Sequence, residues 1–300
     1  MLLDTASMYF RTFYGVPETV TAPDGTPVNA VRGLLEAISR LVSDVKPQRL
    51  VACLDADWRP QWRTDAIPSY KAHRAEPDGT EQIPPALVVQ IPLITQLLDA
   101  AGIAIAEHAG YEADDVIATL AARSQMPVDV VTGDRDLFQL VDDEAGVRVL
   151  YTVKGFGRLE AIDEAEVTRR YGVPAKAYAD FAVLRGDPSD GLPGVPGVGE
   201  KTAATLIRTF GSIDGIKNAL DLGHGGFAAG TRKKLEAARD YLDIAPAVVA
   251  TARDVPLPDV DGALPARPPD PDQLAEIGAA LGLGSSLSRF RAVVTEGDAT

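Results

Sequence analysis

Two kinds of apolar pattern alternate along the first half of the chain. Short apolar runs, most of them rich in β-branched residues, are typical of buried strands, and they fall at residues 2–4, 50–54, 103–106, 128–132 and 147–152. Between them, apolar residues recur every three or four positions, which is the spacing of one helix face, at residues 31–42, 86–101 and 113–123. Strands that alternate with helices predict an α/β fold with a largely parallel sheet that is covered on both faces.

The second half has a helical pattern with few strand signals, and helices are expected at 167–171, 175–184, 201–210, 232–242 and 270–281. We therefore expect an α/β core over 1–162, a helical region over 163–254, and a C-terminal segment over 255–300 that packs back on the core. A polar stretch at 59–85 interrupts the core. It is long for a loop inside an α/β unit, which favours a functional role. The end of the chain, 295–300, is expected to be frayed.

Composition narrows the class of protein. The 300 residues are 46% hydrophobic and 24% charged, which is typical of a globular protein. The single cysteine, Cys53, excludes an intrachain disulfide, and three scattered histidines argue against a zinc site. The N-terminus lacks the basic segment of a signal peptide, and no stretch is apolar and long enough to cross a bilayer. We therefore expect a cytoplasmic protein without membrane contact.

The net charge is −14, from 43 acidic and 29 basic residues, and an acidic balance disfavours nucleic-acid binding on average. The acids are not evenly spread, however. Those that follow predicted strands, open a predicted helix or stand in a glycine-rich turn are Asp4, Asp55, Glu112, Asp114, Asp115, Asp134, Asp136, Asp187 and Asp190. Because ligands bind beyond the carboxyl ends of parallel strands, we expect the strand-end aspartates to point into one crevice.

Each of these acids, taken alone, has a structural explanation as a helix cap or a charged first turn. Taken together they indicate a metal site, because clustered carboxylates repel one another unless cations lie between them. Oxygen ligands favour Mg²⁺ or Mn²⁺ over zinc. A pair of such ions clamps the attacking and leaving oxygens of a phosphodiester. The acids therefore predict metal-dependent phosphoryl transfer or a nuclease.

A second motif is the glycine- and proline-rich segment 192–203, which comes directly before a predicted helix. A P-loop needs lysine directly after glycine, whereas Glu200 intervenes between Gly199 and Lys201. A helix–hairpin–helix fits better, because its backbone amides bind a phosphate at a helix N-terminus. Such a motif holds a DNA backbone without reading its sequence. A simple turn between helices is the alternative.

Five segments in a fixed order resemble the 5′ nuclease (flap endonuclease) family, and most closely the 5′→3′ exonuclease part of bacterial DNA polymerase I. They are residues 3–11, Asp55 with the downstream Tyr70–Arg74, 111–117, 132–137 and 184–203. The resemblance covers most of the chain and is weakest after residue 255. It implies a PIN-like core, a helical arch at about 59–85 and a helix–hairpin–helix region. No polymerase part follows within the 300 residues, so we expect a stand-alone nuclease.

The resemblance also implies roles for single residues. One metal ion is expected around Asp4, Asp55, Glu112 and Asp114, and a second around Asp134, Asp136 and Asp190, with Asp115 and Asp187 contributing directly or through water. Lys71 and Arg74, three residues apart on one face of the arch helix, would contact the scissile phosphate. The expected DNA contacts are Arg11, Arg63, Tyr70, Gly194, Gly197, Gly199, Lys201 and Thr202. For Tyr70, stacking on a base and burial in the core are both open, and for Lys71 and Arg74 a solvated basic face is the alternative.

We therefore expect a monomeric enzyme that hydrolyses DNA at 5′ flaps, nicks and 5′ ends during replication and repair, with RNA primers as further substrates. Its expected cofactors are two Mg²⁺ or Mn²⁺ ions, and a third divalent ion is left open. A potassium ion bound by the hairpin carbonyls is a further option. The expected place is the cytoplasm, in association with the nucleoid. A PIN-like ribonuclease and a non-catalytic module that binds branched DNA are the alternatives.

Overall fold

A six-stranded sheet forms the centre of the first half of the chain. In the computed structural model, which describes residues 1–295, the strands lie in the order β3-β2-β1-β4-β5-β6. All neighbours pair in parallel except β5 and β6, which are antiparallel. The strands are β1 (Leu2–Asp4), β2 (Val51–Cys53), β3 (Ala104–Ala106), β4 (Val128–Thr132), β5 (Val147–Tyr151) and β6 (Glu160–Ile162). The frayed end was expected at 295–300, and all of these residues except Thr295 lie outside the described part of the chain.

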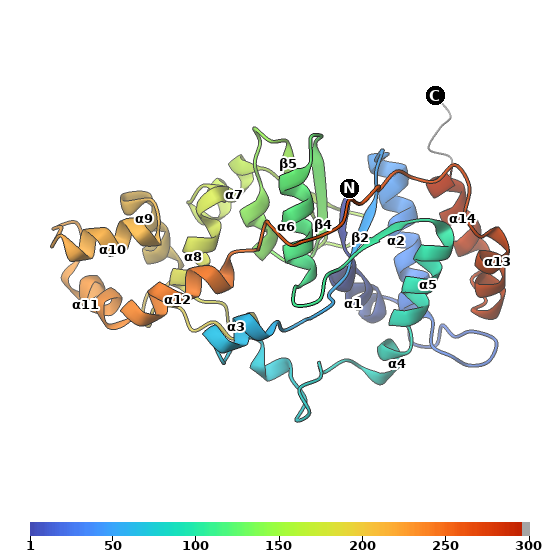
Figure 1. The fold of residues 1–300 in the computed structure, drawn as a ribbon, viewed down its shortest axis with the longest axis horizontal. Coiled ribbons are helices and arrows are strands. Elements are labelled where there is room, and N and C mark those ends of the chain that lie inside the picture. Colours follow the sequence, from blue (N-terminus) through green and yellow to red (C-terminus); the bar gives the residue numbers. More distant parts are fainter. Residues whose placement is uncertain (296–300) are drawn as a thin grey trace.

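Helices cover both faces of this sheet, as the alternating pattern predicts (Figure 1). One face carries Leu3, Ala52 and Val131, which pack with α1 (Thr5–Gly15), α2 (Asn29–Val45) and α5 (Ile91–Ala101). The neighbouring positions Leu2, Val51 and Val130 point to the other face and pack with α6 (Ala113–Arg123). Successive strand residues therefore serve two separate cores, which explains why both kinds of position are apolar.

Six helices follow the sheet and form the elongated end of the molecule at the left of Figure 1. They are α7 (Glu164–Tyr171), α8 (Tyr178–Arg185), α9 (Glu200–Phe210), α10 (Ile213–Asp221), α11 (Ala229–Ala237) and α12 (Arg239–Val249). An aromatic cluster of Phe138, Tyr171, Tyr178 and Phe181 joins them to the sheet, with ring centroids 5.0–6.1 Å apart. The helical region therefore shares one apolar core with the α6 face of the sheet.

After α12 the chain returns along the sheet to the opposite end of the molecule (Figure 1). The Arg123 guanidinium donates to the carbonyls of Val255 and Leu257, and the amide of Leu50 donates to the carbonyl of Gly262. Two last helices, α13 (Pro271–Ala280) and α14 (Gly284–Thr295), then pack on α5 and α2. Within residues 1–295, no helix is both long and apolar enough to cross a membrane.

The polar stretch 59–85 has little regular structure. It holds α3 (Gln61–Ala66) and a 3₁₀ turn at Ala72–Arg74, and α4 (Pro85–Val88) follows. Lys71 lies at φ +48° just before the turn, so it does not share a helix face with Arg74 as their spacing predicts. The reason is Pro68, which disfavours helical geometry at Ile67 and ends α3 there.

Two other predicted helices are each divided in two. The helix expected at 86–101 breaks between α4 and α5 at Gln90, whose side-chain oxygen accepts from the amides of Ala30 and Val31. The helix expected at 232–242 is divided between α11 and α12 at Ala238. The pattern also missed α1, α10, α14 and β6. The strand β1 passes into α1 without a loop, so no turn residue marks the boundary.

Candidate active site

The carboxyl ends of the central strands present the predicted aspartates. Asp4 ends β1 and also caps α1, since its Oδ1 accepts from the Ser7 amide at 3.0 Å. The hydroxyl of Thr132, at the end of β4, donates to the other oxygen of Asp4 at 2.6 Å. Asp55 follows β2 and accepts from the Ala113 amide at 2.7 Å. The capping explanation is thus correct for Asp4, and Asp4 and Asp55 follow neighbouring strands at the same edge of the sheet.

Helix α6 brings its first turn to the same edge. Glu112 is the N-cap of α6, and Asp115 accepts from the Glu112 amide at 3.2 Å in a capping box. Both side chains are buried, whereas Asp114 is half-buried. An acidic first turn is favoured by the helix dipole, and here it also faces the strand-end aspartates.

The electrostatics show which acids are neighbours. Burial first, and then the charges of Asp55 and Asp134, raise the pKa of Asp4 to about 7. Burial and the charges of Asp4 and Asp134 raise the pKa of Asp114 well above its ordinary value. Carboxylates from β1, β2, β4 and α6 therefore lie close enough to oppose one another's ionisation.

A second group surrounds Asp136, which opens the 3₁₀ turn Asp136–Leu140. Burial and the charges of Asp134, Asp190 and Asp187 raise its pKa well above the ordinary value. Its Oδ1 is buried without a hydrogen-bond partner. Asp190 lies in the 3₁₀ turn Pro188–Asp190, and burial together with the Asp134 charge raises its pKa. Asp134 thus belongs to both groups of acids.

Asp187 differs from these neighbours. Burial opposes its ionisation, yet hydrogen bonds from Ser189 and Arg135 hold the pKa of its carboxyl below the ordinary value. Arg135 NH2 donates to it at 2.8 Å and Arg185 NH2 at 3.3 Å. Asp115 is likewise surrounded by donors from Arg63, Glu112 and Ala252. Both acids therefore have their oxygens engaged by the protein itself.

Cations hold part of this edge. Lys71 Nζ contacts Glu112 Oε1, and Arg74 NH2 donates to Asp190 at 2.9 Å. Among residues 1–295, no three His, Cys, Asp or Glu side chains close around a single point that could hold a metal ion. Divalent cations nevertheless fit the chemistry of the donors, because the acids repel one another and Asp136 leaves an oxygen unpartnered.

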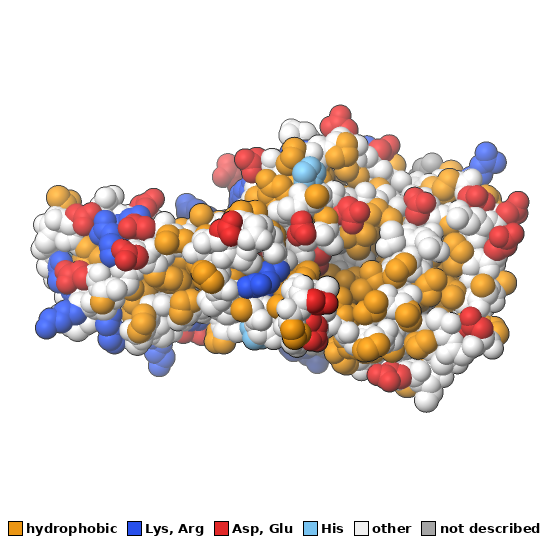
Figure 2. Space-filling view, turned by 60° about the horizontal axis from the view of Figure 1, so that its bottom comes forward, with side chains coloured by type: hydrophobic (Ala, Val, Ile, Leu, Met, Phe, Trp, Pro, Cys, Tyr) orange, Lys and Arg blue, Asp and Glu red, His pale blue; other side chains and the backbone are white. Residues whose placement is uncertain are grey.

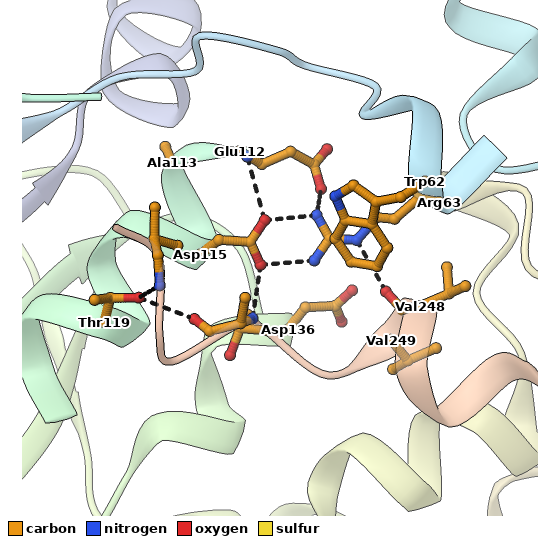
Figure 3. A network of polar contacts seen from close by, with 12 residues as sticks. Trp62, Arg63, Glu112, Ala113, Asp115, Thr119, Asp136, Val248 and Val249 are labelled. Atoms are coloured by element: carbon orange, nitrogen blue, oxygen red, sulfur yellow. Dashed lines mark hydrogen bonds and ion pairs between the residues drawn. The ribbon is translucent and has the colours of Figure 1, made fainter. Parts of the chain in front are cut away.

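Two expected DNA contacts are buried instead. Arg63 is only 2% exposed, and its guanidinium bonds to Glu112, Asp115 and the carbonyl of Val248 (Figure 3). Tyr70 is 4% exposed, and its hydroxyl donates to Glu112 Oε2 at 2.7 Å. Neither side chain is presented to DNA in this structure, because both bond to Glu112, and for Tyr70 the observation favours the alternative of burial in the core. Sequence spacing could not show this, since the partners are about 40 to 190 residues away.

Other residues of the site were missed in the sequence. Thr132 orients Asp4, and Arg135 holds Asp187. Trp62 stacks on the Arg63 guanidinium, 4.3 Å from the ring centroid, and its indole N–H donates to the carbonyl of Gly110. The signal for Thr132 and Arg135 was their place on either side of Asp134. Trp62 gave no signal beyond its position next to Arg63.

The glycine-rich segment forms a tight turn that leads into α9. Gly194 and Gly197 have φ of +65° and +76°, which favours glycine. Gly199 is the N-cap of α9, and a Cβ there would meet nothing within 4 Å. Lys201 and Thr202 follow in the first turn of α9, and helix N-termini are places where anions bind. The carbonyl of Gly197 accepts from Lys234 of α11 at 2.8 Å.

Arg11 lies on α1. Its Nε donates to the carbonyl of Thr152, at the end of β5, at 2.8 Å. It lines an open hollow with Tyr14, which is 73% exposed, and with Arg32. The side chain is thus placed at the surface of the sheet's carboxyl edge.

Comparison with known proteins assigns the chain. The family model described as 5′-3′ exonuclease, N-terminal resolvase-like domain, matches residues 1–172, and the model for its C-terminal SAM fold matches residues 173–272. A 5′-3′ exonuclease of Streptomyces coelicolor is 58% identical, over 98% of this chain and all of that protein. A 5′-3′ exonuclease of Mycobacterium tuberculosis is 51% identical, over 97% of this chain and 96% of that one.

A solved structure shares the fold. The T5 D15 flap endonuclease, in a complex with DNA and metal ions, superposes with a TM-score of 0.62 at 17% identity, over 99% of this chain and 98% of that one. The acid-lined edge and these relatives thus define a nuclease. The chain belongs to the 5′-3′ exonuclease family, which confirms the resemblance seen in its five sequence motifs.

Proposed function

We propose that this chain is a structure-specific 5′ nuclease that hydrolyses phosphodiesters of branched or 5′-ended DNA with two divalent ions, Mg²⁺ or Mn²⁺. The observation that carries this proposal is the meeting of acids from β1, β2, β4 and α6 at one edge, with basic side chains among them. Family membership supports the 5′→3′ direction, and the DNA in the T5 D15 complex supports the substrate class.

The residues that would hold the ions are the acids that lie close enough at this edge to oppose one another's ionisation. These are Asp4, Asp55, Glu112, Asp114, Asp134, Asp136 and Asp190. When bound, such ions neutralise phosphate charge and lower the pKa of water, which supplies a nucleophile. Asp115 and Asp187 are proposed to orient their neighbours, since arginines and amides fill their hydrogen-bonding capacity.

Lys71 and Arg74 are the cations proposed to stabilise charge on the scissile phosphate. Each now pairs with an acid of the site, Lys71 with Glu112 and Arg74 with Asp190. An ion bound by these acids would replace the two cations as their counter-charge. The basic side chains would then be available to the DNA.

The proposed division of work follows the chain. Residues 1–162 carry most of the acids, and Asp187 and Asp190 of the helical region join them. Residues 163–254 would also hold the duplex through Gly194, Gly197, Gly199, Lys201 and Thr202, and the segment from residue 255 packs back on the core. The two family models divide at residue 172, ten residues later than the pattern of helices suggested. Removal of flaps and RNA primers in replication and repair is the biological role that fits this activity.

The deciding experiment is cleavage of a labelled 5′-flap duplex in Mg²⁺ or Mn²⁺, with Asp134→Ala beside the wild type and single-stranded RNA as a control. Asp134→Ala should abolish cleavage, because Asp134 belongs to both groups of acids. Cleavage near the flap junction that needs both the metal and Asp134 supports the proposal. Binding of the flap without cleavage in either metal would favour a non-catalytic module, and cleavage of the RNA alone would favour a ribonuclease.

A further inference from the structure

Arg63 is a buried cation that joins three parts of the chain which are distant in sequence (Figure 3). It lies on α3 of the irregular stretch, yet its Nε donates to the carbonyl of Val248 in α12 at 3.1 Å. Its NH1 and NH2 donate to the two oxygens of Asp115 at 2.8 and 2.7 Å. A bidentate arginine–carboxylate pair is specific in geometry as well as strong. The irregular stretch, α6 and the end of α12 are thereby fixed to one another.

The two carboxylate oxygens of Glu112 have different partners, and the Arg63 guanidinium bonds to one of them. Oε2 accepts from Arg63 NH1 and, at 2.7 Å, from the Tyr70 hydroxyl. Oε1 pairs with Lys71, which is more exposed than Arg63 and belongs to the loop after α3. Arg63 cannot leave Oε2 without breaking its bonds to Asp115 and Val248. One oxygen of Glu112 is thus held by the protein, and the other is left to an exchangeable cation.

From this geometry we infer that Arg63, with Asp115 as its counter-charge, is a positioning residue that presents Glu112 Oε1 to the metal site. This inference rests on the proposed function. Groups that orient a metal ligand typically change metal affinity by about 10–100-fold when they are removed. Arg63 therefore acts through Glu112, and it needs no contact with DNA or metal.

The test is Mn²⁺ affinity of the DNA-free protein, measured by electron paramagnetic resonance of the unbound ion. The informative variant is the double substitution Arg63→Met with Asp115→Leu, because it removes one charge of each sign and leaves the net charge of the site unchanged. We expect it to bind Mn²⁺ about tenfold more weakly than the wild type. Affinity equal to that of the wild type would overturn the inference.

Two further variants separate positioning from stability. Arg63→Met alone should lower the Tm more than the double variant does, because it leaves the Asp115 carboxylate buried without its partner. Arg123→Met is the matched control, since Arg123 fastens the far end of α6 to the carbonyls of Val255 and Leu257. It should lower the Tm and leave Mn²⁺ affinity unchanged.

Each remaining outcome has a distinct meaning. A loss of affinity in Arg123→Met as large as in the double variant would overturn the inference, because affinity would then follow the stability of α6. A wild-type protein that binds no Mn²⁺ would overturn the proposed function, and the role of Arg63 would fall with it. Wild-type binding and flap cleavage with a fully active double variant would leave the proposed function standing and remove the positioning role alone.

Discussion

Asp4 illustrates how one side chain serves folding and chemistry at once. It caps α1 through the Ser7 amide and accepts from Thr132, and both hydrogen bonds favour the ionised carboxylate. Burial and two neighbouring acids outweigh these bonds and raise its pKa to about 7. Without metal, ionised carboxylates at this edge of the sheet therefore destabilise the folded state. Such stored repulsion is expected at a site built for a cation.

We predict that the metal-free protein becomes more stable as the pH falls from about 8 to about 5. Because the pKa of Asp4 is higher in the folded chain than in the unfolded one, the folded state binds more protons in this window. A group that is protonated in the folded chain and ionised in the unfolded one lowers the free energy of unfolding by at most about 1.4 kcal/mol per pH unit, and this effect ends as the pH rises past its folded pKa. Thermal unfolding across this pH range measures the trend.

Two comparisons test the cause of this pH dependence. Acids with lowered pKa, such as Asp187, are ionised in both states above pH 5 and contribute little to the slope. Asp4→Asn should flatten the slope and raise the Tm at pH 7.5. Saturating Mg²⁺ should also flatten the slope in the wild type, because a bound ion offsets the repulsion. A metal-free protein whose stability rises with pH over this range would contradict the prediction.

At the scale of elements, the sequence predicts what is local and fails where distant partners decide. The runs at 128–132 and 113–123 match β4 and α6 residue for residue, because their patterns are uninterrupted. The helix expected at 86–101 breaks at Gln90, since that side chain caps the start of α2. The acids were marked by three local signals, which are the strand ends, the start of α6 and a glycine-rich turn. The burial of Arg63 and Tyr70 depends on Val248 and Glu112, which no local pattern could connect to them.

The hairpin before α9 yields an element-scale prediction. Gly194 has φ +65°, and a Cβ there would lie 2.5 Å from the backbone nitrogen of Gly186. Gly194→Ala should therefore destabilise the protein by roughly 2–4 kcal/mol and weaken flap binding, since neither backbone can move away freely. The midpoint of urea unfolding measures the loss of stability.

The matched control is Gly230→Ala in α11. A Cβ at Gly230 would meet nothing within 4 Å, and alanine favours a helix over glycine by about 1 kcal/mol. This variant should be as stable as the wild type or slightly more so. If Gly194→Ala and Gly230→Ala unfolded at the same urea concentration, the close approach of Gly194 to Gly186 would not affect the free energy of unfolding.

At the scale of the whole molecule, the basic side chains are unevenly spread along the long axis. The chain carries −14 in total, yet most Lys and Arg side chains visible in Figure 2 gather over the end that carries α9 to α11. Exposed bases of this end include Lys201, Arg208 and Lys233. An overall acidic protein can thus present a basic surface to a DNA backbone, because only the local charge meets the phosphates.

We predict that binding of a 5′-flap duplex weakens steeply with salt. Each DNA phosphate that a Lys or Arg side chain neutralises lowers the logarithm of the binding constant by about 0.9 per tenfold rise in salt concentration. Lys201→Ala should reduce the steepness of this salt dependence by the share of one phosphate contact, about 0.9. Fluorescence anisotropy of a labelled flap duplex at several KCl concentrations measures the slope. Lys46→Ala, at the far end of α2, is the control and should leave the slope unchanged. An affinity of the wild type that does not depend on salt would contradict the prediction.

The return of the chain after α12 has a consequence for synthesis on the ribosome. The apolar face of α2 is covered by α14, and roughly 240 residues separate the two helices. At about 5–20 residues per second, α2 waits on the order of 10–50 s for its cover. The face of α2 that α14 covers is therefore exposed while the helical end is already being made. A chain that ends before residue 284 would keep this apolar surface exposed. We expect such a chain to need chaperones or to aggregate.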